Sequence, residues 1–203
     1  IVTEIKQNGD SVLNQIDRTI RNSDSISFFG KRAYGASTFS ALPLTSTQTC
    51  TNTSKTATRD NTFDICTLIL KNPQPQGGYT RIDLRLENEK ECATNSLFTA
   101  SDRRVGASST ECNGNIQIAI GTDTQLSDLQ LGTPSVVSQQ LLTNVEKQSG
   151  VSVTDYTIEV IPSTGHPTLV RLGYTFSQGI AATSRVDAKA SVDFETTISL
   201  RTY

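Results

Sequence analysis

The chain has 203 residues, of which 35% are hydrophobic and 19% are charged, and its formal net charge is -2 at pH 7. This balance excludes a strongly basic nucleic-acid-binding protein and a disordered chain, so no nucleic-acid partner is expected. No stretch approaches the roughly 18 consecutive apolar residues of a membrane-spanning helix, and the printed residues contain no signal peptide.

Residues 1–22 carry their apolar side chains at helical spacing. The positions that share one stripe, roughly 100° wide, are Val2, Ile5, Gly9, Val12, Leu13, Ile16 and Ile20. The pattern predicts one continuous amphipathic helix that ends at the polar cluster Asn22 to Asp24. Because the stripe must be buried, we expect this helix to cover one face of a sheet, with Gly9 allowing a close approach to a neighbour.

The middle of the chain, residues 26–150, reads as short strands separated by long irregular segments. Strand patterns occur at residues 25–29, 63–70, 79–86 and 116–120. In the third of these, Arg81, Asp83 and Arg85 alternate with apolar residues, which predicts a hairpin with one face in water. Residues 30–62 and 87–115 are predicted to be irregular, and loops of such length are usually functional. Residues 139–148 fit either a short helix or the start of a strand.

The C-terminal part, residues 151–203, has the clearest strand patterns. Apolar and polar residues alternate through three segments, 156–160, 170–176 and 190–200, and a turn at residues 162–167 separates the first two. We expect three antiparallel strands here, with their apolar face under the N-terminal helix.

The four cysteines are Cys50, Cys66, Cys92 and Cys112. Their spacings match no zinc motif, so two disulfides are preferred over four buried thiols or a metal site. Three connectivities are open, and pairing between neighbours would close two modest loops. Disulfides would place the protein outside the cytoplasm.

No residue pattern indicates catalysis, a metal site or a cofactor. His166, the only histidine, lies in a Gly-His-Pro turn, and the chain has neither a nucleophile motif nor a Gly-rich phosphate loop. Two oxygen-rich groups, Asp60 to Asp64 and Asp123 with Asp128, lack the spacing of a calcium loop. We therefore predict a protein that is not an enzyme and has no cofactor.

The best candidates for binding lie in the two irregular segments. Tyr34 and Phe39 could form a surface on a loop held by Cys50, and a disulfide-held loop loses little freedom on binding. Arg103 and Arg104 could contact an anionic surface. Asn52, Thr53 and Ser54 form a glycosylation sequon.

Three stretches resemble the type IV pilin superfamily, in particular minor pilins and type II secretion pseudopilins. Residues 15–26 look like the end of a prepilin-type helix entering the first strand, residues 153–176 are similar to the penultimate hairpin of the family, and residues 192–201 look like its closing strand. Together they cover roughly a third of the chain, at its two ends.

The resemblance implies an α+β, pilin-like fold, in which one N-terminal amphipathic helix packs on an antiparallel sheet with long disulfide-bearing loops. A single domain would comprise residues 1–203, with the helix at 1–22, a loop-rich β middle at 26–150 and the C-terminal sheet at 151–203. It also implies a structural subunit of a pilus-like filament that contacts other pilin subunits through the helix and contributes to adhesion to a host or other cell surface, with a place at the tip as one option. The pilus would lie at the cell surface, and its subunits would be anchored in the inner membrane before assembly.

One departure from the family concerns the start of the chain. A leader, a prepilin peptidase site and a long apolar run normally come first, and none is present; Glu4 does not belong to such a run. The expectation is therefore a soluble ectodomain whose membrane contact depends on a segment before Ile1. The alternative is a secreted or virion-borne adhesin or fibre-type binding module unrelated to pilins. Adhesion, motility, secretion and DNA uptake all remain open as the purpose of a filament.

Overall fold

A computed structural model describes residues 2–33, 36–53, 65–85, 92, 96–105, 110–131, 138–146, 149–179 and 190–200. The helix α1 spans Val2–Arg21, within the stretch whose apolar spacing predicts it. Its buried residues are Ile5, Gly9, Val12, Ile16 and Ile20. They recur every three to four positions, so the helix buries one stripe and leaves the opposite side to solvent.

A four-stranded antiparallel sheet lies against α1. Its strands, in spatial order, are β12 (Ser191–Ser199), β11 (Leu169–Gln178), β10 (Val151–Ile161) and β3 (Gln48–Thr53). The helix contacts β12 and β11. Strand β3 comes from the Thr- and Ser-rich segment whose sequence predicted an irregular loop, and it pairs along β10 from Gln48 to Thr53.

A second, six-stranded antiparallel sheet is built from the middle of the chain. Its order is β2 (Ser40–Ala41), β1 (Ser25–Arg32), β4 (Ile65–Lys71), β5 (Tyr79–Arg85), β8 (Asn115–Gly121) and β9 (Ser138–Leu141). Strands β4, β5 and β8 are the central ones, and nearly all their residues are buried on both faces. A sheet buried on both faces requires a covering layer on each side.

The remaining elements are short. A two-stranded ribbon pairs β6 (Arg104–Val105) with β7 (Thr110–Glu111), and the 3-10 helix η1 (Asp123–Gln125) leads directly into α3 (Leu126–Leu129). Among the described helices, none is long and apolar enough to cross a membrane.

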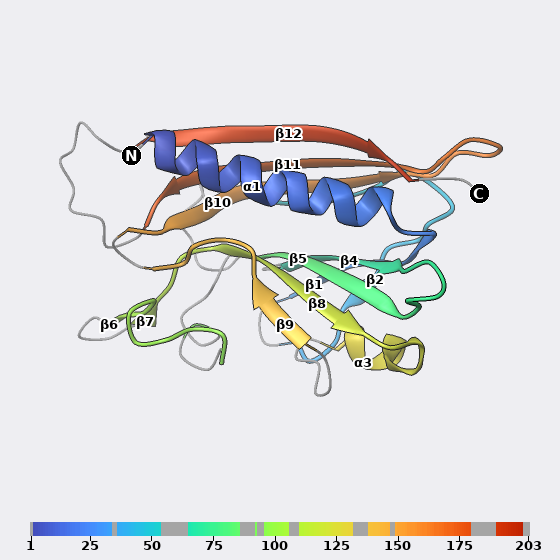
Figure 1. Ribbon diagram of the computed structural model, residues 1–203, viewed down its shortest axis with the longest axis horizontal. Coiled ribbons are helices and arrows are strands. Elements are labelled where there is room, and N and C mark those ends of the chain that lie inside the picture. Colours follow the sequence, from blue (N-terminus) through green and yellow to red (C-terminus); the bar gives the residue numbers. More distant parts are fainter. Residues whose placement is uncertain are drawn as a thin grey trace.

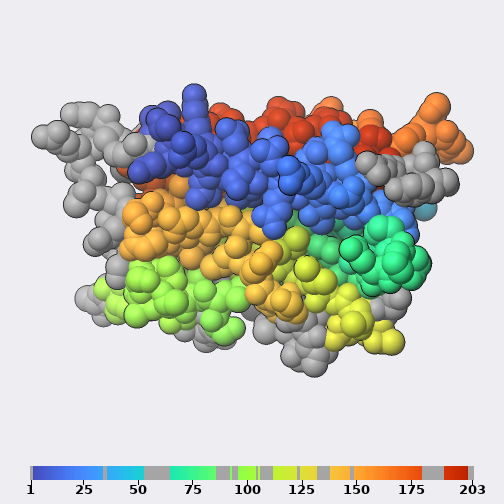
Figure 2. All heavy atoms as spheres, in the orientation of Figure 1, coloured from blue at the N-terminus to red at the C-terminus, as the bar shows by residue number. Residues whose placement is uncertain are grey.

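One hydrophobic core joins α1 and both sheets. It contains Ile16 of α1, Leu172 of β11 and Ile82 of β5, all at most 2% exposed. Figure 1 shows the two sheets as separate layers with α1 lying along the four-stranded one, and in the space-filling view of Figure 2 the same elements form one closely packed body. The layers touch through main chain where Val153 N donates to the carbonyl oxygen of Gly114 at 2.9 Å.

The predicted α+β, pilin-like fold class is wrong. In the described residues the protein is mostly β, with ten strands in two antiparallel sheets and one long helix. The difference lies in the middle of the chain, where the sequence predicts short strands between loops and the structure has a complete second sheet. Apolar runs in this sheet, such as Ile65 to Leu70, are buried on both faces of the strand. They therefore form a separate layer of the fold.

The predicted wet face of β5 is also wrong. Arg81 is 2% exposed, and its Nε and Nη2 donate to the two carboxylate oxygens of Asp83 at 2.7 and 2.6 Å. Its Nη1 donates to the carbonyl oxygens of Leu129 and Leu131 at 2.9 and 2.6 Å. Burial of Arg81 is possible because its guanidinium meets the Asp83 carboxylate and two main-chain carbonyl oxygens, from Leu129 of α3 and from Leu131 just after it.

Candidate functional site

Phe39, predicted to lie on an exposed loop, is in the interior. Its side chain is 9% exposed, and the guanidinium carbons of Arg81 and Arg32 lie 4.7 and 5.8 Å from the centre of its ring. These are cation–π distances, which stabilise an aromatic ring beside buried positive charge. Phe39 therefore holds the β1–β2 connection on the six-stranded sheet. Tyr34, its proposed companion, lies outside the described residues.

Arg103 and Arg104, the two arginines predicted to contact an anionic surface, lie in different surroundings. Arg103 is half-buried, and its Nε donates to the carbonyl oxygen of Cys92 at 3.0 Å, so it ties the ribbon of β6 and β7 to the second disulfide. The main chain of Arg104 belongs to β6, whereas its side chain lies outside what the structure describes. Next to it Val105 is 77% exposed, one of the most exposed apolar side chains described.

All four cysteines form disulfides, in the pairing between neighbours. Cys50 of β3 bonds to Cys66 of β4, which links the four-stranded sheet to the six-stranded sheet. Cys92 bonds to Cys112 in a small second core with Phe98. Two disulfides are typical of an oxidising, extracellular compartment.

The other residues that the sequence singled out do not assemble into a site. His166 is exposed in the turn between β10 and β11, and Asn52 of the sequon is only 7% exposed, within β3. Asp60 to Asp64 lie outside the described residues. Among those that are described, no group of three or more His, Cys, Asp and Glu side chains is placed to hold a metal ion.

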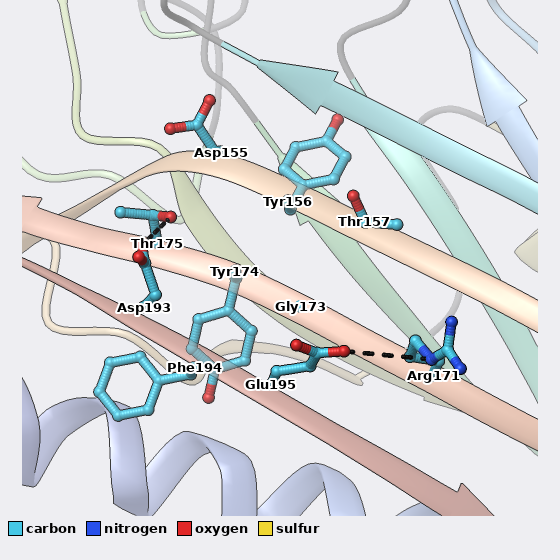
Figure 3. A pocket seen from close by; sticks show the side chains of 10 residues that line it. All are labelled: Asp155, Tyr156, Thr157, Arg171, Gly173, Tyr174, Thr175, Asp193, Phe194 and Glu195. Carbon is cyan, nitrogen blue, oxygen red and sulfur yellow. Dashed lines mark hydrogen bonds and ion pairs between the residues drawn. The ribbon is translucent and has the colours of Figure 1, made fainter.

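A shallow hollow with a volume of about 350 Å³ lies on the four-stranded sheet at Gly173 of β11 (Figure 3). We call it the Gly173 hollow. Its polar lining residues are Asp155, Thr157, Arg171, Thr175, Asp193 and Glu195. They come from three adjacent strands, because Thr157 pairs with Gly173 and Gly173 pairs with Glu195. A Cβ at Gly173 would make only an ordinary contact of 3.8 Å with the carbonyl oxygen of Phe194, so the missing side chain leaves open space there.

Carboxylates dominate the charge of the Gly173 hollow. Arg171 donates to Glu159 at 2.9 Å and lies 4.0 Å from Glu195, while the hydroxyl of Thr175 donates to Asp193 at 2.6 Å. Asp155 follows a bulge in β10, and its Oδ1 is buried without a hydrogen-bond partner. The hollow therefore presents acceptors, which suit the amino, guanidinium or hydroxyl groups of a partner surface.

The Gly173 hollow suits contact better than chemistry. Among the described residues, its lining holds no histidine or cysteine, and Asp193 and Glu195 are exposed, so water competes for their hydrogen bonds. The hydroxyl of Thr175 and the carboxylate of Asp193 are within hydrogen-bond reach, but this contact lies in the solvent-exposed part of the sheet. The sequence signal that could have found the hollow is a glycine inside an alternating strand, a pattern that indicates a gap or close approach.

Comparison with known proteins found no relative of the chain. No protein-family model matches the chain, no curated protein matches it, and no solved structure matches it.

Proposed function

We propose that this chain is a structural and interaction subunit of a type IV pilus-like filament, in which α1 is the assembly element. The observation that carries the proposal is the two-sided character of α1. One stripe, from Ile5 to Ile20, is buried in the core of its own domain, and the helix runs along the four-stranded sheet (Figure 1). The opposite side stays available to neighbouring subunits.

The exposed side of α1 is chemically suited to contacts between copies. It carries both charge signs and several amides, and its exposed residues include Lys6, Gln7, Asp10, Asn14 and Arg18. Mixed charges support specific, reversible packing better than one sign does, because a single sign would repel an identical surface. The residues that resemble prepilin-type proteins include the last two turns of this helix, residues 15–21.

The proposed place of action is the cell surface. The two disulfides fit an oxidising compartment, and a filament subunit would be anchored in the inner membrane before assembly by a segment preceding Ile1. In the filament, α1 would face other subunits while the β layers face outward, and the outward surfaces would serve adhesion. A position at the tip agrees with this arrangement.

The coding sequence upstream of Ile1 tests this proposal. A short basic leader followed by a long apolar run is expected, because a filament subunit needs a membrane segment before assembly. A cleavable secretory signal peptide, or an upstream sequence without an apolar segment, would contradict the proposal.

The second candidate is a secreted or virion-borne adhesin or fibre-type binding module without relation to pilins. The specific observation in its favour is the pair of packed antiparallel sheets with a depression on the outer face of one of them, at Gly173. Such sandwiches present binding surfaces without any filament. The same upstream sequence separates the two candidates.

A further inference from the structure

A second hollow lies at one end of the six-stranded sheet, away from the Gly173 hollow. It is formed by the turn that joins β4 to β5 and by the end of β8 where η1 begins, and its volume is about 720 Å³. In Figure 2 these segments, green around residue 75 and yellow around residue 125, lie side by side on the visible face. A volume of this size is in the range of small-molecule sites.

In the part of the chain that the structure describes, the lining of this second hollow is polar and uncharged. We call it the neutral hollow, and the side chains that matter are Asn72, Gln76, Thr80, Ile120, Thr122 and Gln125. Amide groups both donate and accept hydrogen bonds, and hydroxyl groups do the same. A charged ligand would lose water here without meeting an opposite charge from the lining, so the chemistry favours a neutral ligand rich in hydroxyl groups.

Two of the amides are held in place before any ligand arrives. The hydroxyl of Thr80 donates to Oδ1 of Asn72 at 2.9 Å, and the main-chain N–H of Thr122 donates to Oε1 of Gln125 at 2.7 Å. A side chain whose orientation is already fixed loses less conformational entropy on binding. Gln76, by contrast, is exposed at the turn.

Three glycines, Gly77, Gly78 and Gly121, bring main chain to the lining of the neutral hollow. Gly78 has a positive φ of 74°, and a Cβ there would overlap the carbonyl oxygen of Gly121. Only glycine allows the turn to touch the end of β8 so closely. The two walls of the hollow are therefore fixed relative to each other through backbone contact.

Ile120 adds an apolar surface to these polar groups. Its side chain is 50% exposed at the end of β8, although most of that strand is buried. A hexose ring is amphipathic in the same way, with hydroxyl groups at its edge and an apolar C–H face. Amides beside an exposed aliphatic side chain therefore match both parts of a sugar ring.

We propose that the neutral hollow binds a neutral hexose unit of a glycan. The sugar would place vicinal hydroxyl groups against Asn72, Gln76 and Gln125, with its C–H face on Ile120. This inference goes beyond the filament role and does not depend on it, because the site lies within one chain and binding would occur in the isolated domain.

The test is an NMR titration of the 15N-labelled chain with three separate probes: methyl β-D-galactopyranoside, methyl α-D-glucopyranoside and methyl α-D-mannopyranoside. At least one should shift the amide signals of Gly77, Gly78, Gly121 and Thr122 in a saturable way. The affinity is expected to be about millimolar, as one sugar ring supplies few contacts. Absence of saturable shifts with all three probes, or shifts confined to other residues, would overturn the proposal.

Two variants sharpen the result. Gln76→Ala should weaken binding about fivefold, the effect of one lost hydrogen bond, while the matched Gln7→Ala variant on the exposed side of α1 should bind like the parent chain. Methyl β-D-glucuronide, the charged counterpart, should bind at least about fivefold more weakly than the best neutral probe because its carboxylate meets no opposite charge. Equal weakening by both variants, or tighter binding of the glucuronide, would contradict the assignment.

Discussion

The hydroxyl group of Tyr174 in β11 donates a hydrogen bond of 2.9 Å to the main-chain carbonyl oxygen of Gly9 in the middle of α1. Both partners are buried, and they are 165 positions apart in the chain. The ring of Phe194 stacks on that of Tyr174 with 5.3 Å between ring centres. A Cβ at Gly9 would overlap the ring of Phe194, so the helix and the sheet are in close contact at this point.

The substitution Tyr174→Phe tests the hydrogen bond. The variant leaves the Gly9 carbonyl without its hydroxyl partner and should lower the free energy of unfolding by about 0.5–1.5 kcal/mol at pH 7. Urea unfolding of both proteins followed by circular dichroism measures the difference. The control is Tyr79→Phe at a partly buried tyrosine of β5, which should change stability less.

The same pair predicts a dependence on alkaline pH. Burial, and secondarily the negative charge of Asp10, raise the pKa of Tyr174 well above its usual 10.0. The folded state therefore holds the neutral phenol. The contribution of Tyr174 to the free energy of unfolding is complete below pH 10 and is lost as the pH rises toward the raised pKa. The stability difference between the parent chain and Tyr174→Phe should shrink above pH 10. A difference that stays constant from pH 8 to pH 11 would contradict the burial of this hydroxyl.

Gly9→Ala should destabilise the protein although alanine favours helices. The gain in helix propensity is about 1 kcal/mol, whereas forcing a methyl group against Phe194 costs about 1–3 kcal/mol. Adding Phe194→Leu to Gly9→Ala should therefore restore part of the loss, and a double-mutant cycle measures the coupling. Additive effects of the two substitutions would show that α1 does not approach the sheet this closely.

The buried pair of Arg81 and Asp83 predicts sensitivity to acid. Burial by itself would raise the pKa of Asp83, but the charges of Arg81 and Arg85 and hydrogen bonds from Arg81 and Thr67 outweigh it, so that the pKa lies below its usual 3.8. The ionised carboxylate of Asp83 therefore stabilises the folded protein fully above about pH 4, and this stabilisation is lost as the pH falls through the lowered pKa.

Asp83→Asn should lower the free energy of unfolding by about 3–5 kcal/mol at pH 7, because it leaves the Arg81 charge buried without its carboxylate. The exposed pair of Arg171 and Glu159 supplies the control, and Glu159→Gln should cost about 1 kcal/mol or less. Equal effects of the two substitutions in urea unfolding would contradict the enclosed position of Asp83.

Removing the disulfide between the sheets tests how the two layers are held. Replacing Cys50 and Cys66 together by alanine should lower stability by about 2–4 kcal/mol, because the bond closes a loop of 16 residues between β3 and β4. The parent chain and the double variant are compared by thermal unfolding without reductant. If the melting temperatures were the same, Cys50 and Cys66 would not be bonded to each other.

Local patterns predicted those parts of the structure that depend on local periodicity. The stripe of α1 and the alternation in β10 to β12 are visible along the chain. The sequence favours two disulfides but leaves three connectivities open, and the structure shows the pairing between neighbours. Strand β3 could not be predicted from its own residues, because a segment rich in Thr and Ser, such as the one with Thr49, Thr51 and Thr53, also occurs in loops. Its strand conformation depends on pairing with β10. The alternation in β5 predicts a solvent-facing Arg81, whereas its burial depends on Leu129 and Leu131, about fifty residues away.

The sequence does not locate either hollow, although Gly173 inside an alternating strand does indicate a gap in the sheet. The Gly173 hollow requires three strands in register, and the neutral hollow requires the turn at Gly78 to meet the end of β8 at Gly121. Both depend on contacts between distant segments, about which single-sequence patterns carry no information. Phe39 was misplaced for the same reason, since its partners Arg32 and Arg81 lie on two strands of the assembled sheet.

Immunogold electron microscopy of the cells that produce this chain tests its role as a filament subunit most directly. Antibodies against the folded domain, with a deletion strain as the background control, should place gold on surface filaments, along their length or at the tip. Restoring the gene should restore the label. Filaments that remain unlabelled while the protein is recovered from the medium would contradict the filament assignment.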